Sequence, residues 1–228
     1  QESGFLTSES LFGDKFPKQP YKSLAVLGAG PIGVEFAHVF DSAGTKVTIL
    51  QHNVRLVPKE DADISEHLLN NYRERGINVL LNQDTVEIRQ EDGLKVVVTK
   101  DRTTGEITET KVEEILVAAG IRPAVEELHL ENTGIETRPK GWIKTNEFLE
   151  TSVDGIYALG DVNGEPAFRH RANYEADIIA HNLFYATSED DYRWARYDTL
   201  PKVTFSYPEI GSVGLTEAEA IKAGYNVG

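Results

Sequence analysis

The stretch Ser23–Gln51, S-L-A-V-L-G-A-G-P-I-G-V-E-F-A-H-V-F-D-S-A-G-T-K-V-T-I-L-Q, decides the fold of this chain. Its apolar run Leu24–Leu27 is typical of a buried parallel strand and leads directly into G-A-G-P-I-G. Apolar residues then recur at helical spacing until Gly44, which ends the predicted helix. Lys46–Leu50 is typical of a second strand. The stretch therefore predicts a strand, a glycine turn, a helix and a second strand.

Each glycine of the turn has a physical role in a dinucleotide-binding unit. Gly28 permits the tight turn, Gly30 leaves room for a pyrophosphate, and Gly33 lets the helix lie close to the strand. The helix N-terminus offers unpaired N–H groups and the positive end of its dipole, and Pro31 suits its first turn. A G-x-G-x-x-G pattern alone is weak, but the flanking strand and helix are the context that it requires. We therefore predict a dinucleotide site at the turn, with Ile32 among its contacts.

The end of the second predicted strand bears on the choice of cofactor. An acidic side chain there is typical of NAD sites, because it binds the ribose hydroxyls and repels a 2′-phosphate. This chain has Gln51, His52 and then Arg55, whose guanidinium could pair with a phosphate. Alternatively, Arg55 points to solvent and Gln51 binds the ribose. We expect both NADH and NADPH to bind, with a preference for NADPH.

Composition restricts the classes of function. The formal charge of −14 opposes binding to nucleic acid or to anionic membranes. No apolar stretch approaches the ~20 residues needed to span a bilayer, and the N-terminal residues do not resemble a signal peptide. We therefore expect a cytoplasmic protein with no nucleic-acid or membrane partner. The six histidines show no metal-binding spacing, so no metal site is predicted.

Two residue types are absent from the sequence. Without cysteine, these residues cannot form a disulfide framework or carry out thiol chemistry. Without methionine, even at position 1, the chain is expected to be a fragment of a longer protein.

The pattern changes along the chain from alternating strands and helices to consecutive strands. Asp61 or Asp63 is expected to cap a helix with an apolar row at Ile64, Leu68 and Tyr72. A third strand is expected at residues 77–81 and a further strand at residues 114–118. Between them, three strands separated by turns predict an antiparallel meander at 85–89, 94–100 and 106–112.

A second region begins after Gly141. Ile156–Leu159 is expected to form a strand with Gly160 and Asp161 at its carboxyl end, where open α/β sheets bind ligands. Arg169–Tyr185 is expected to be a helix. Its predicted apolar face comprises Ala172, Ala176, Ile179, Ala180 and Leu183. Short strands are expected at residues 203–205 and 213–215.

The motifs together resemble the flavoprotein disulfide reductases, the pyridine nucleotide-disulfide oxidoreductase family of dihydrolipoamide dehydrogenase, glutathione reductase and mercuric reductase. G-A-G-P-I-G-V-E-F-A is similar to the nicotinamide-nucleotide motif, and A-A-G-I-R-P to the loop that follows that domain. T-S-V-D-G-I-Y-A-L-G-D-V resembles the second FAD motif, and L-P-K-V-T-F-S-Y-P-E-I-G-S-V-G-L-T-E the start of the dimer-interface domain. The resemblance covers nearly the whole chain, in the order of the family.

The resemblance implies an α/β fold. It comprises a Rossmann-like NAD(P)-binding domain of three layers with an antiparallel β-meander, and part of a second, FAD-binding domain. The implied division is 1–22, a lead-in from the FAD domain; 23–143, the NAD(P) domain; 144–198, the end of the FAD domain; and 199–228, the truncated start of the interface domain.

The resemblance also assigns roles to residues. Glu35 matches a glutamate beside the nicotinamide amide and the flavin edge. Val86 and Gly120 match further nucleotide contacts, and Gly160 with Asp161 matches the contact to the FAD ribityl chain. The segment that reaches the isoalloxazine is matched by Ala167, Phe168, Arg169 and His170. For Asp161 the alternative is a loop-capping aspartate. Pro31 stands where glutathione reductase has a tyrosine that gates the nicotinamide pocket, so no such gate is predicted.

The function implied is hydride transfer from NAD(P)H to FAD in the intact enzyme. The partners implied are the missing half of the FAD domain, with its own glycine motif and the cysteine pair, and the second subunit of a homodimer. No catalytic residue is assigned to this chain, which alone is expected to be inactive. One alternative is a free-standing nucleotide-binding sensor. Another, direct use of NAD(P) on a bound substrate, has no His or Lys that stands out as an acid or base.

Overall fold

The computed structural model describes residues 4–13, 16–164 and 167–228. The chain forms two compact units. The first unit comprises Gln1–Gly120 together with Val203–Gly228, and the second comprises Ile121–Lys202. The four-part domain division expected from the sequence stays a prediction.

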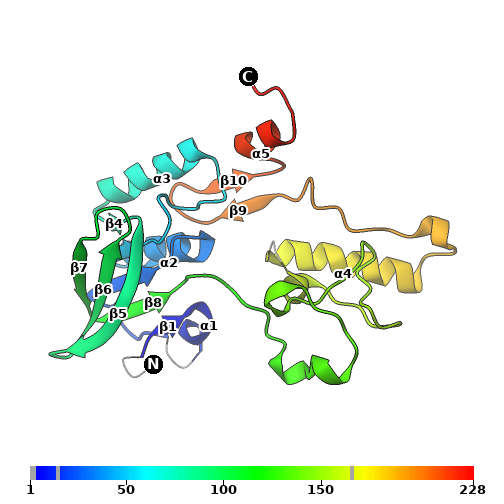
Figure 1. Ribbon diagram of the computed structural model, residues 1–228, viewed down its shortest axis with the longest axis horizontal. Coiled ribbons are helices and arrows are strands. Elements are labelled where there is room, and N and C mark those ends of the chain that lie inside the picture. Colours follow the sequence, from blue (N-terminus) through cyan, green and yellow to red (C-terminus); the bar gives the residue numbers. More distant parts are fainter. Residues whose placement is uncertain (1–3, 14–15, 165–166) are drawn as a thin grey trace. The chain divides into compact units, whose positions relative to one another are not determined.

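A parallel sheet forms the centre of the first unit (Figure 1). Its strands, in spatial order, are β1 (Leu6–Thr7), β8 (Glu114–Val117), β2 (Ser23–Leu27), β3 (Lys46–Leu50) and β4 (Asn78–Leu80). All neighbouring pairs are parallel. The chain runs from β2 through β3 to β4 and then returns to the other side of β2 as β8. The sheet order therefore reverses between β2 and β8, and ligands bind at such a switch point in open α/β sheets.

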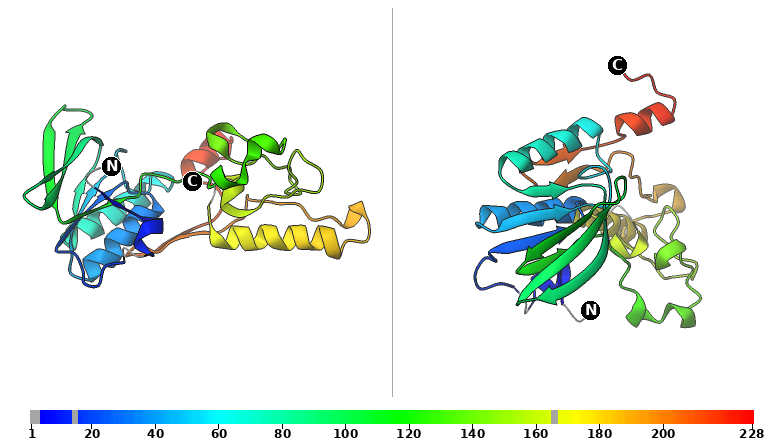
Figure 2. Two further views of the ribbon diagram at one scale, coloured as in Figure 1. Left: turned by 90° about the horizontal axis from the view of Figure 1, so that it is seen from below. Right: turned by 60° about the vertical axis from the view of Figure 1, so that its left-hand side comes forward.

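Different elements cover the two faces of this sheet (Figure 2). Helices α2 (Pro31–Ser42) and α3 (Ala62–Glu74) pack on one face through a core that includes Leu24 and Val26 of β2. Alanine and leucine at the alternate positions, Ala25 and Leu27, belong to a second core with residues of the meander. Strand β2 is therefore buried on both faces, as its unbroken apolar run predicted. The three-layer Rossmann-like fold class is confirmed.

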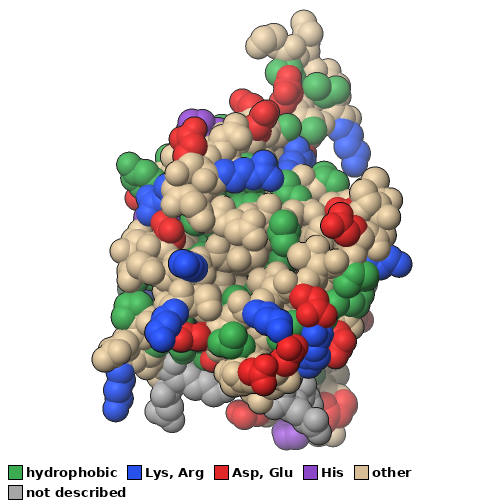
Figure 3. Space-filling view, turned by 90° about the vertical axis from the view of Figure 1, so that its left-hand side faces the viewer, with side chains coloured by type: hydrophobic (Ala, Val, Ile, Leu, Met, Phe, Trp, Pro, Cys, Tyr) green, Lys and Arg blue, Asp and Glu red, His purple; other side chains and the backbone are tan. Residues whose placement is uncertain are grey.

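The meander consists of three antiparallel strands, β5 (Gln83–Glu91), β6 (Leu94–Asp101) and β7 (Ile107–Val112). A register shift occurs in β5 between Thr85 and Glu87. Surface side chains pair across the strands, with Arg89 Nη2 2.8 Å from Glu109 Oε1 and Lys111 Nζ 2.7 Å from Glu91 Oε1. Figure 3 shows positive and negative side chains interleaved over this end of the molecule.

Some parts of the first unit differ from the sequence-based expectation. The described residues of the lead-in at 1–22, where sequence analysis placed no helix or strand, contain strand β1 and the short helix α1 (Ser8–Leu11). Near the C-terminal end, β9 (Lys202–Thr204) pairs with β10 (Ile210–Ser212), followed by α5 (Glu217–Lys222). The strand expected at residues 213–215 is wrong, because β10 precedes it. Ile210 is buried in the helical core, whereas Val213 and Leu215 are exposed.

The start of α3 also differs in detail. Asp61 is its N-cap residue but its side chain makes no capping hydrogen bond, whereas Asp63 Oδ1 accepts from the first-turn N–H of Ile64 at 2.9 Å. The Asp61 carboxylate instead accepts a hydrogen bond from the backbone N–H of Glu217, 2.9 Å away. Leu68 and Tyr72 are buried as predicted, but Ile64 is exposed.

The second unit is built around helix α4 (Arg169–Phe184). Short 3-10 turns surround it in sequence: η1 (Glu126–Leu128), η2 (Leu130–Asn132), η3 (Pro139–Gly141), η4 (Gly160–Asn163) and η5 (Glu189–Asp191). The strand expected at Ile156–Leu159 is wrong, since the segment forms a single bridge between Tyr157 and Glu150. Ile156 and Leu159 are both exposed.

The buried face of α4 is not the predicted alanine-rich face. The residues that are buried are Arg171, Glu175 and Ile178, whereas Leu183 is exposed. No helix in the described ranges has the length and apolar character required to cross a membrane.

Candidate nucleotide-binding site

The glycine turn lies at the switch point of the parallel sheet, and two of its glycines are required by the fold. Gly28 has φ of +103°, and a Cβ there would lie 2.5 Å from the carbonyl oxygen of Ala118. A Cβ at Gly33 would lie 2.1 Å from the carbonyl oxygen of Gly28. Any side chain at either position would displace the strand end or the helix.

Gly30 is different, because the fold gives no reason for glycine at this position. Its φ of −72° and ψ of −176° are available to any residue. Apart from atoms of Gly30 itself and of the two adjacent residues, no described atom lies within 4 Å of the place where its Cβ would stand. The space above Gly30 is therefore open. A phosphate group that approached the backbone would occupy this space.

The N-terminus of α2 is free to bind an anion. Gly30 is the N-cap residue, and no described side chain accepts a hydrogen bond from the first N–H groups of the helix. Pro31, at the first helical position, is exposed, and Ile32 is half-buried. Unpaired N–H groups together with the positive end of the helix dipole favour a negatively charged ligand.

Hydrogen bonds from neighbouring strands hold the turn in place. The Gly28 N–H donates to the Leu50 carbonyl oxygen at 2.9 Å, and the Ala118 N–H donates to the Leu27 carbonyl oxygen at 2.8 Å. The segment that follows β8 therefore lies beside the turn. It leads to Gly120, which is exposed and has φ of +135°.

Gln51 also supports the turn, which the sequence did not reveal. Only 4% of its surface is exposed. Its Oε1 accepts a hydrogen bond from the Ala29 N–H at 3.2 Å, and its Nε2 donates to the Arg55 carbonyl oxygen at 3.1 Å. Since both ends of the amide are engaged within the protein, Gln51 positions the loop that a nucleotide would contact.

The other two predicted residues at the end of β3 lie in different settings. Arg55 is half-buried, and its Nη2 donates to the Pro58 carbonyl oxygen at 3.4 Å. His52 is exposed, and its Nδ1 lies 2.7 Å from Oδ1 of Asp84 on β5. The premise that no acid stands at the end of β3 is therefore wrong. Asp84 is far from His52 in sequence, so no local pattern could have placed it there.

Two further predicted contacts belong to the first unit. Glu35 lies on α2, and its Oε1 accepts a hydrogen bond from the Phe205 N–H at 2.8 Å. Val86 lies on β5 at the register shift and is exposed. Their assignment to nucleotide contacts stays a prediction.

The second unit contains another glycine turn, in the predicted FAD motif. Gly160 has φ of +71°, and its N–H donates to Oε2 of Glu175 at 2.6 Å. Asn163 Nδ2 donates to the Ala158 carbonyl oxygen at 3.2 Å. The Asp161 side chain is exposed, which leaves its carboxylate free to accept hydrogen bonds from hydroxyl groups.

A buried charged network anchors this second turn. Arg171 Nε donates to Glu175 Oε1 at 2.9 Å, and the same oxygen accepts from the Tyr197 hydroxyl at 2.5 Å. The Arg171 guanidinium also donates to the Gly164 carbonyl oxygen and to Asn163 Oδ1. Burial, and then the hydrogen bond to Glu175, raises the pKa of Tyr197 to about 12. Sequence reasoning missed this network, because it placed alanines on the buried face of α4.

The predicted flavin segment forms the start of α4. Phe168 is the N-cap residue and stacks on His170, with ring centroids 5.3 Å apart. Nε2 of His170 lies 2.6 Å from the Pro201 carbonyl oxygen. Ala167 is half-buried and Arg169 is exposed. The Phe168 side chain makes no capping hydrogen bond to this helix.

Comparison with known proteins identifies the family of this chain. The family model for pyridine nucleotide-disulphide oxidoreductases matches residues 5–176. This chain belongs to that family. The mercuric reductase of Staphylococcus aureus is 37% identical over 227 residues, which cover 99% of this chain and 40% of that protein. The dihydrolipoyl dehydrogenase of Corynebacterium glutamicum is 34% identical over 200 residues, which cover 87% of this chain and 42% of that protein.

Solved structures agree with these relatives. The Cu(II) complex of the HOCl-induced flavoprotein disulfide reductase RclA from Escherichia coli superposes with a TM-score of 0.84 at 31% identity. That superposition covers 97% of this chain and 47% of the RclA chain. The chain therefore spans less than half the length of these three relatives.

Proposed function

We propose that this chain binds a nicotinamide dinucleotide at the Gly28–Gly33 turn, as part of a protein that transfers hydride from NAD(P)H to FAD. The observation that carries the proposal is the open space above Gly30. The fold requires glycine at positions 28 and 33 but not at position 30, where a pyrophosphate would account for it. Membership of the family supports the proposal, and no finding supports a free-standing sensor.

The second unit would contribute to an FAD site in the whole protein. Asp161 would hold the ribityl hydroxyls, and the segment from Ala167 to His170 would lie at the isoalloxazine. Bound FAD would supply the hydride acceptor. The contribution of these residues is to hold the flavin and orient it. The exposed Asp161 carboxylate supports the first of these roles.

We still propose that NADPH binds more tightly than NADH, but for a different structural reason. The side-chain amide of Gln51 is hydrogen-bonded to the Ala29 N–H and to the Arg55 carbonyl oxygen, so it does not bind the ribose. Arg55 is close to the end of β3 and supplies one positive charge.

We further propose that the whole protein is a homodimer. Exposed apolar side chains in the last segment of the chain support a second subunit; they are Phe205, Tyr207, Val213, Leu215, Ile221 and Tyr225. Light scattering of the full-length protein tests this. The cytoplasmic location and the lack of nucleic-acid and membrane partners stay predictions that rest on charge and composition.

Calorimetric titration of this chain with NADPH and with NADH tests the nucleotide site. We expect saturable binding of both, with NADPH the tighter. The same preparation should be colourless and should not reduce a dye with NADPH, because these residues supply no thiol and only part of the predicted flavin site. No heat of binding with either nucleotide would contradict the proposal, and a yellow preparation would contradict the assigned share of the flavin site.

A further inference from the structure

Three side chains from three separate segments meet at the carboxyl end of β3. His52 follows β3, Asp84 lies on β5, and Arg102 lies in the hairpin between β6 and β7. Asp84 Oδ1 is 2.7 Å from Nδ1 of His52 and 3.6 Å from Nε of Arg102. Arg102 also donates to the His52 carbonyl oxygen at 3.4 Å. We call these residues the charged triad.

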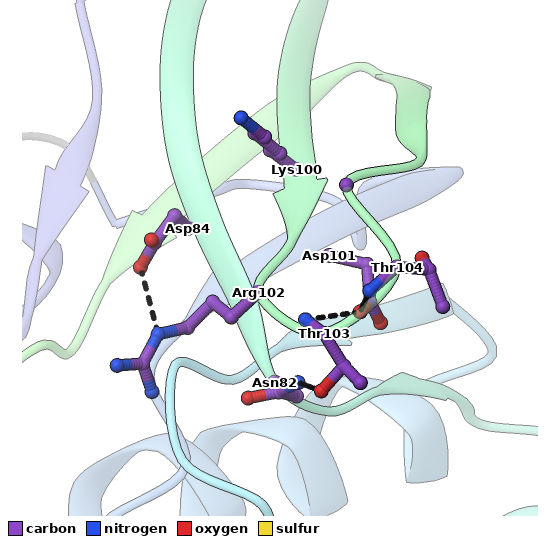
Figure 4. Close-up of a pocket in the computed structure, with 8 residues that line it drawn as sticks. Asn82, Asp84, Lys100, Asp101, Arg102, Thr103 and Thr104 are labelled. Carbon is purple, nitrogen blue, oxygen red and sulfur yellow. Dashed lines mark hydrogen bonds and ion pairs between the residues drawn. The ribbon is translucent and has the colours of Figure 1, made fainter.

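The charged triad is accessible from solvent. The exposed fractions of the three side chains are 59% for His52, 48% for Asp84 and 42% for Arg102. Asp84 and Arg102 border an open hollow of about 610 Å³ on the first unit. Figure 4 shows Arg102 extending toward Asp84, with Lys100 on another wall of the hollow.

A second acid in the hollow provides an internal contrast. Asp101 Oδ1 accepts hydrogen bonds from the N–H groups of Thr103 and Thr104, both at 2.8 Å. These N–H groups, that of Thr104 first, hold the pKa of the Asp101 carboxyl below its usual range. The Asp101 carboxylate therefore stabilises its own turn. The Asp84 carboxylate instead faces the His52 imidazole and the Arg102 guanidinium.

The position of the charged triad relates it to the nucleotide. In a βαβ dinucleotide site, side chains just after the second strand of the unit contact the 2′ position of the adenine ribose. In this chain that strand is β3, and Gln51 is turned inward to the glycine loop. His52 is the next residue, and its contacts with Asp84 and Arg102 place these two side chains at the same end of β3.

We propose that the charged triad sets the preference between NADPH and NADH, with Asp84 opposing the 2′-phosphate and Arg102 favouring it. The inference rests on the proposed nucleotide site and identifies two specificity-determining residues outside the β3 loop. When NADPH binds, its 2′-phosphate competes with the Asp84 carboxylate for His52 and Arg102. When NADH binds, the Asp84 carboxylate keeps both partners and can accept a hydrogen bond from the ribose hydroxyl.

The proposal predicts opposite effects from the two members of one ion pair. Asp84→Asn removes a negative charge and frees His52 and Arg102 for the phosphate, so NADPH should gain over NADH. Arg102→Gln removes a positive charge and leaves Asp84 to repel the phosphate, so NADPH should lose. Exposed charged contacts of this kind change affinity by about 1.5-fold to fivefold.

The test is calorimetric titration of the chain and its variants with NADPH and with NADH at one ionic strength. The quantity compared is the ratio of the two dissociation constants. Arg89→Ala is the matched control, because Arg89 is also an ion-paired arginine of the meander but pairs with Glu109 instead. Circular dichroism confirms that each variant is folded. Either variant of the charged triad, if folded, tests the proposal on its own.

The possible outcomes distinguish failure of the charged-triad inference from failure of the proposed nucleotide binding. Ratios that move in opposite directions for Asp84→Asn and Arg102→Gln, with Arg89→Ala unchanged, support the inference. Equal shifts for both nucleotides, or the same direction in both variants, overturn it and leave the proposed function standing. Failure of the unaltered chain to bind either nucleotide overturns the proposed function, and the inference with it.

Discussion

The two glycine turns of this chain are held in place in different ways. The turn at Gly28–Gly33 lies between strands, fixed by backbone hydrogen bonds to Leu50 and Leu27 and by an apolar core on each face of β2. The turn at Gly160–Gly164 is fixed by side chains of α4, chiefly the buried Arg171 and Glu175.

The difference determines how each turn responds to substitution. Backbone contacts and apolar packing distribute the stability of the first turn over many small terms. In the second turn, much of the stability comes from one buried ion pair. Removing one partner leaves the other charge buried without its counter-ion. The second turn should therefore be much more sensitive to the loss of one side chain.

Loss of Glu175 is expected to have the largest effect on stability. Glu175→Ala leaves the Arg171 guanidinium buried without its carboxylate, which costs about 3–5 kcal/mol in the free energy of unfolding. Both tryptophans, Trp142 and Trp194, lie in the second unit, so urea unfolding followed by their fluorescence reports on that unit. Lys144→Ala, which removes the surface ion pair with Glu136 in the second unit, is the control. A loss of less than about 1 kcal/mol for Glu175→Ala would show that the Arg171–Glu175 ion pair does not stabilise the second turn.

A smaller effect is expected from the titration of Tyr197. Its pKa is raised from 10.0 to about 12, chiefly by burial and then by the hydrogen bond to Glu175. Because the folded state favours the neutral phenol, this contribution is complete below pH 10.0 and is lost as the pH rises through about 12. Urea midpoints of the second unit should therefore fall over this pH range, and fall less in Tyr197→Phe. Identical pH profiles for the two proteins would show that Tyr197 does not contribute to the pH dependence of stability in the second unit.

The sequence predicted the first turn well because its determinants are local. Leu24–Leu27 and Lys46–Leu50 are short apolar strands, and the glycines between them need no distant partner to be recognised. The meander was predicted for the same reason, since Asp92-Gly93 and the Asp101–Gly105 turn separate its strands.

The parts that sequence reasoning missed depend on distant residues. The buried face of α4 carries Arg171 and Glu175, because they satisfy backbone groups of the turn at residues 160–164; a helical pattern of alanines cannot show this. The apolar run Ile156–Leu159 suggested a strand, but it finds a partner only at Glu150. Asp84 reaches His52 through the packing of the meander beside the end of β3. In each case the tertiary partner overrides the local pattern.

The most direct test of the central claim compares Gly30 with Gly33. Gly30→Val places a side chain in open space, so its stability should fall by no more than about 1 kcal/mol, the cost of a poorer N-cap. NADPH affinity should fall by more than about tenfold, because the side chain occupies the place of the pyrophosphate. Gly33→Ala, which meets the Gly28 carbonyl oxygen, should instead destabilise the first unit by about 1–3 kcal/mol. Folded Gly30→Val that binds NADPH as tightly as the unaltered chain would contradict the account.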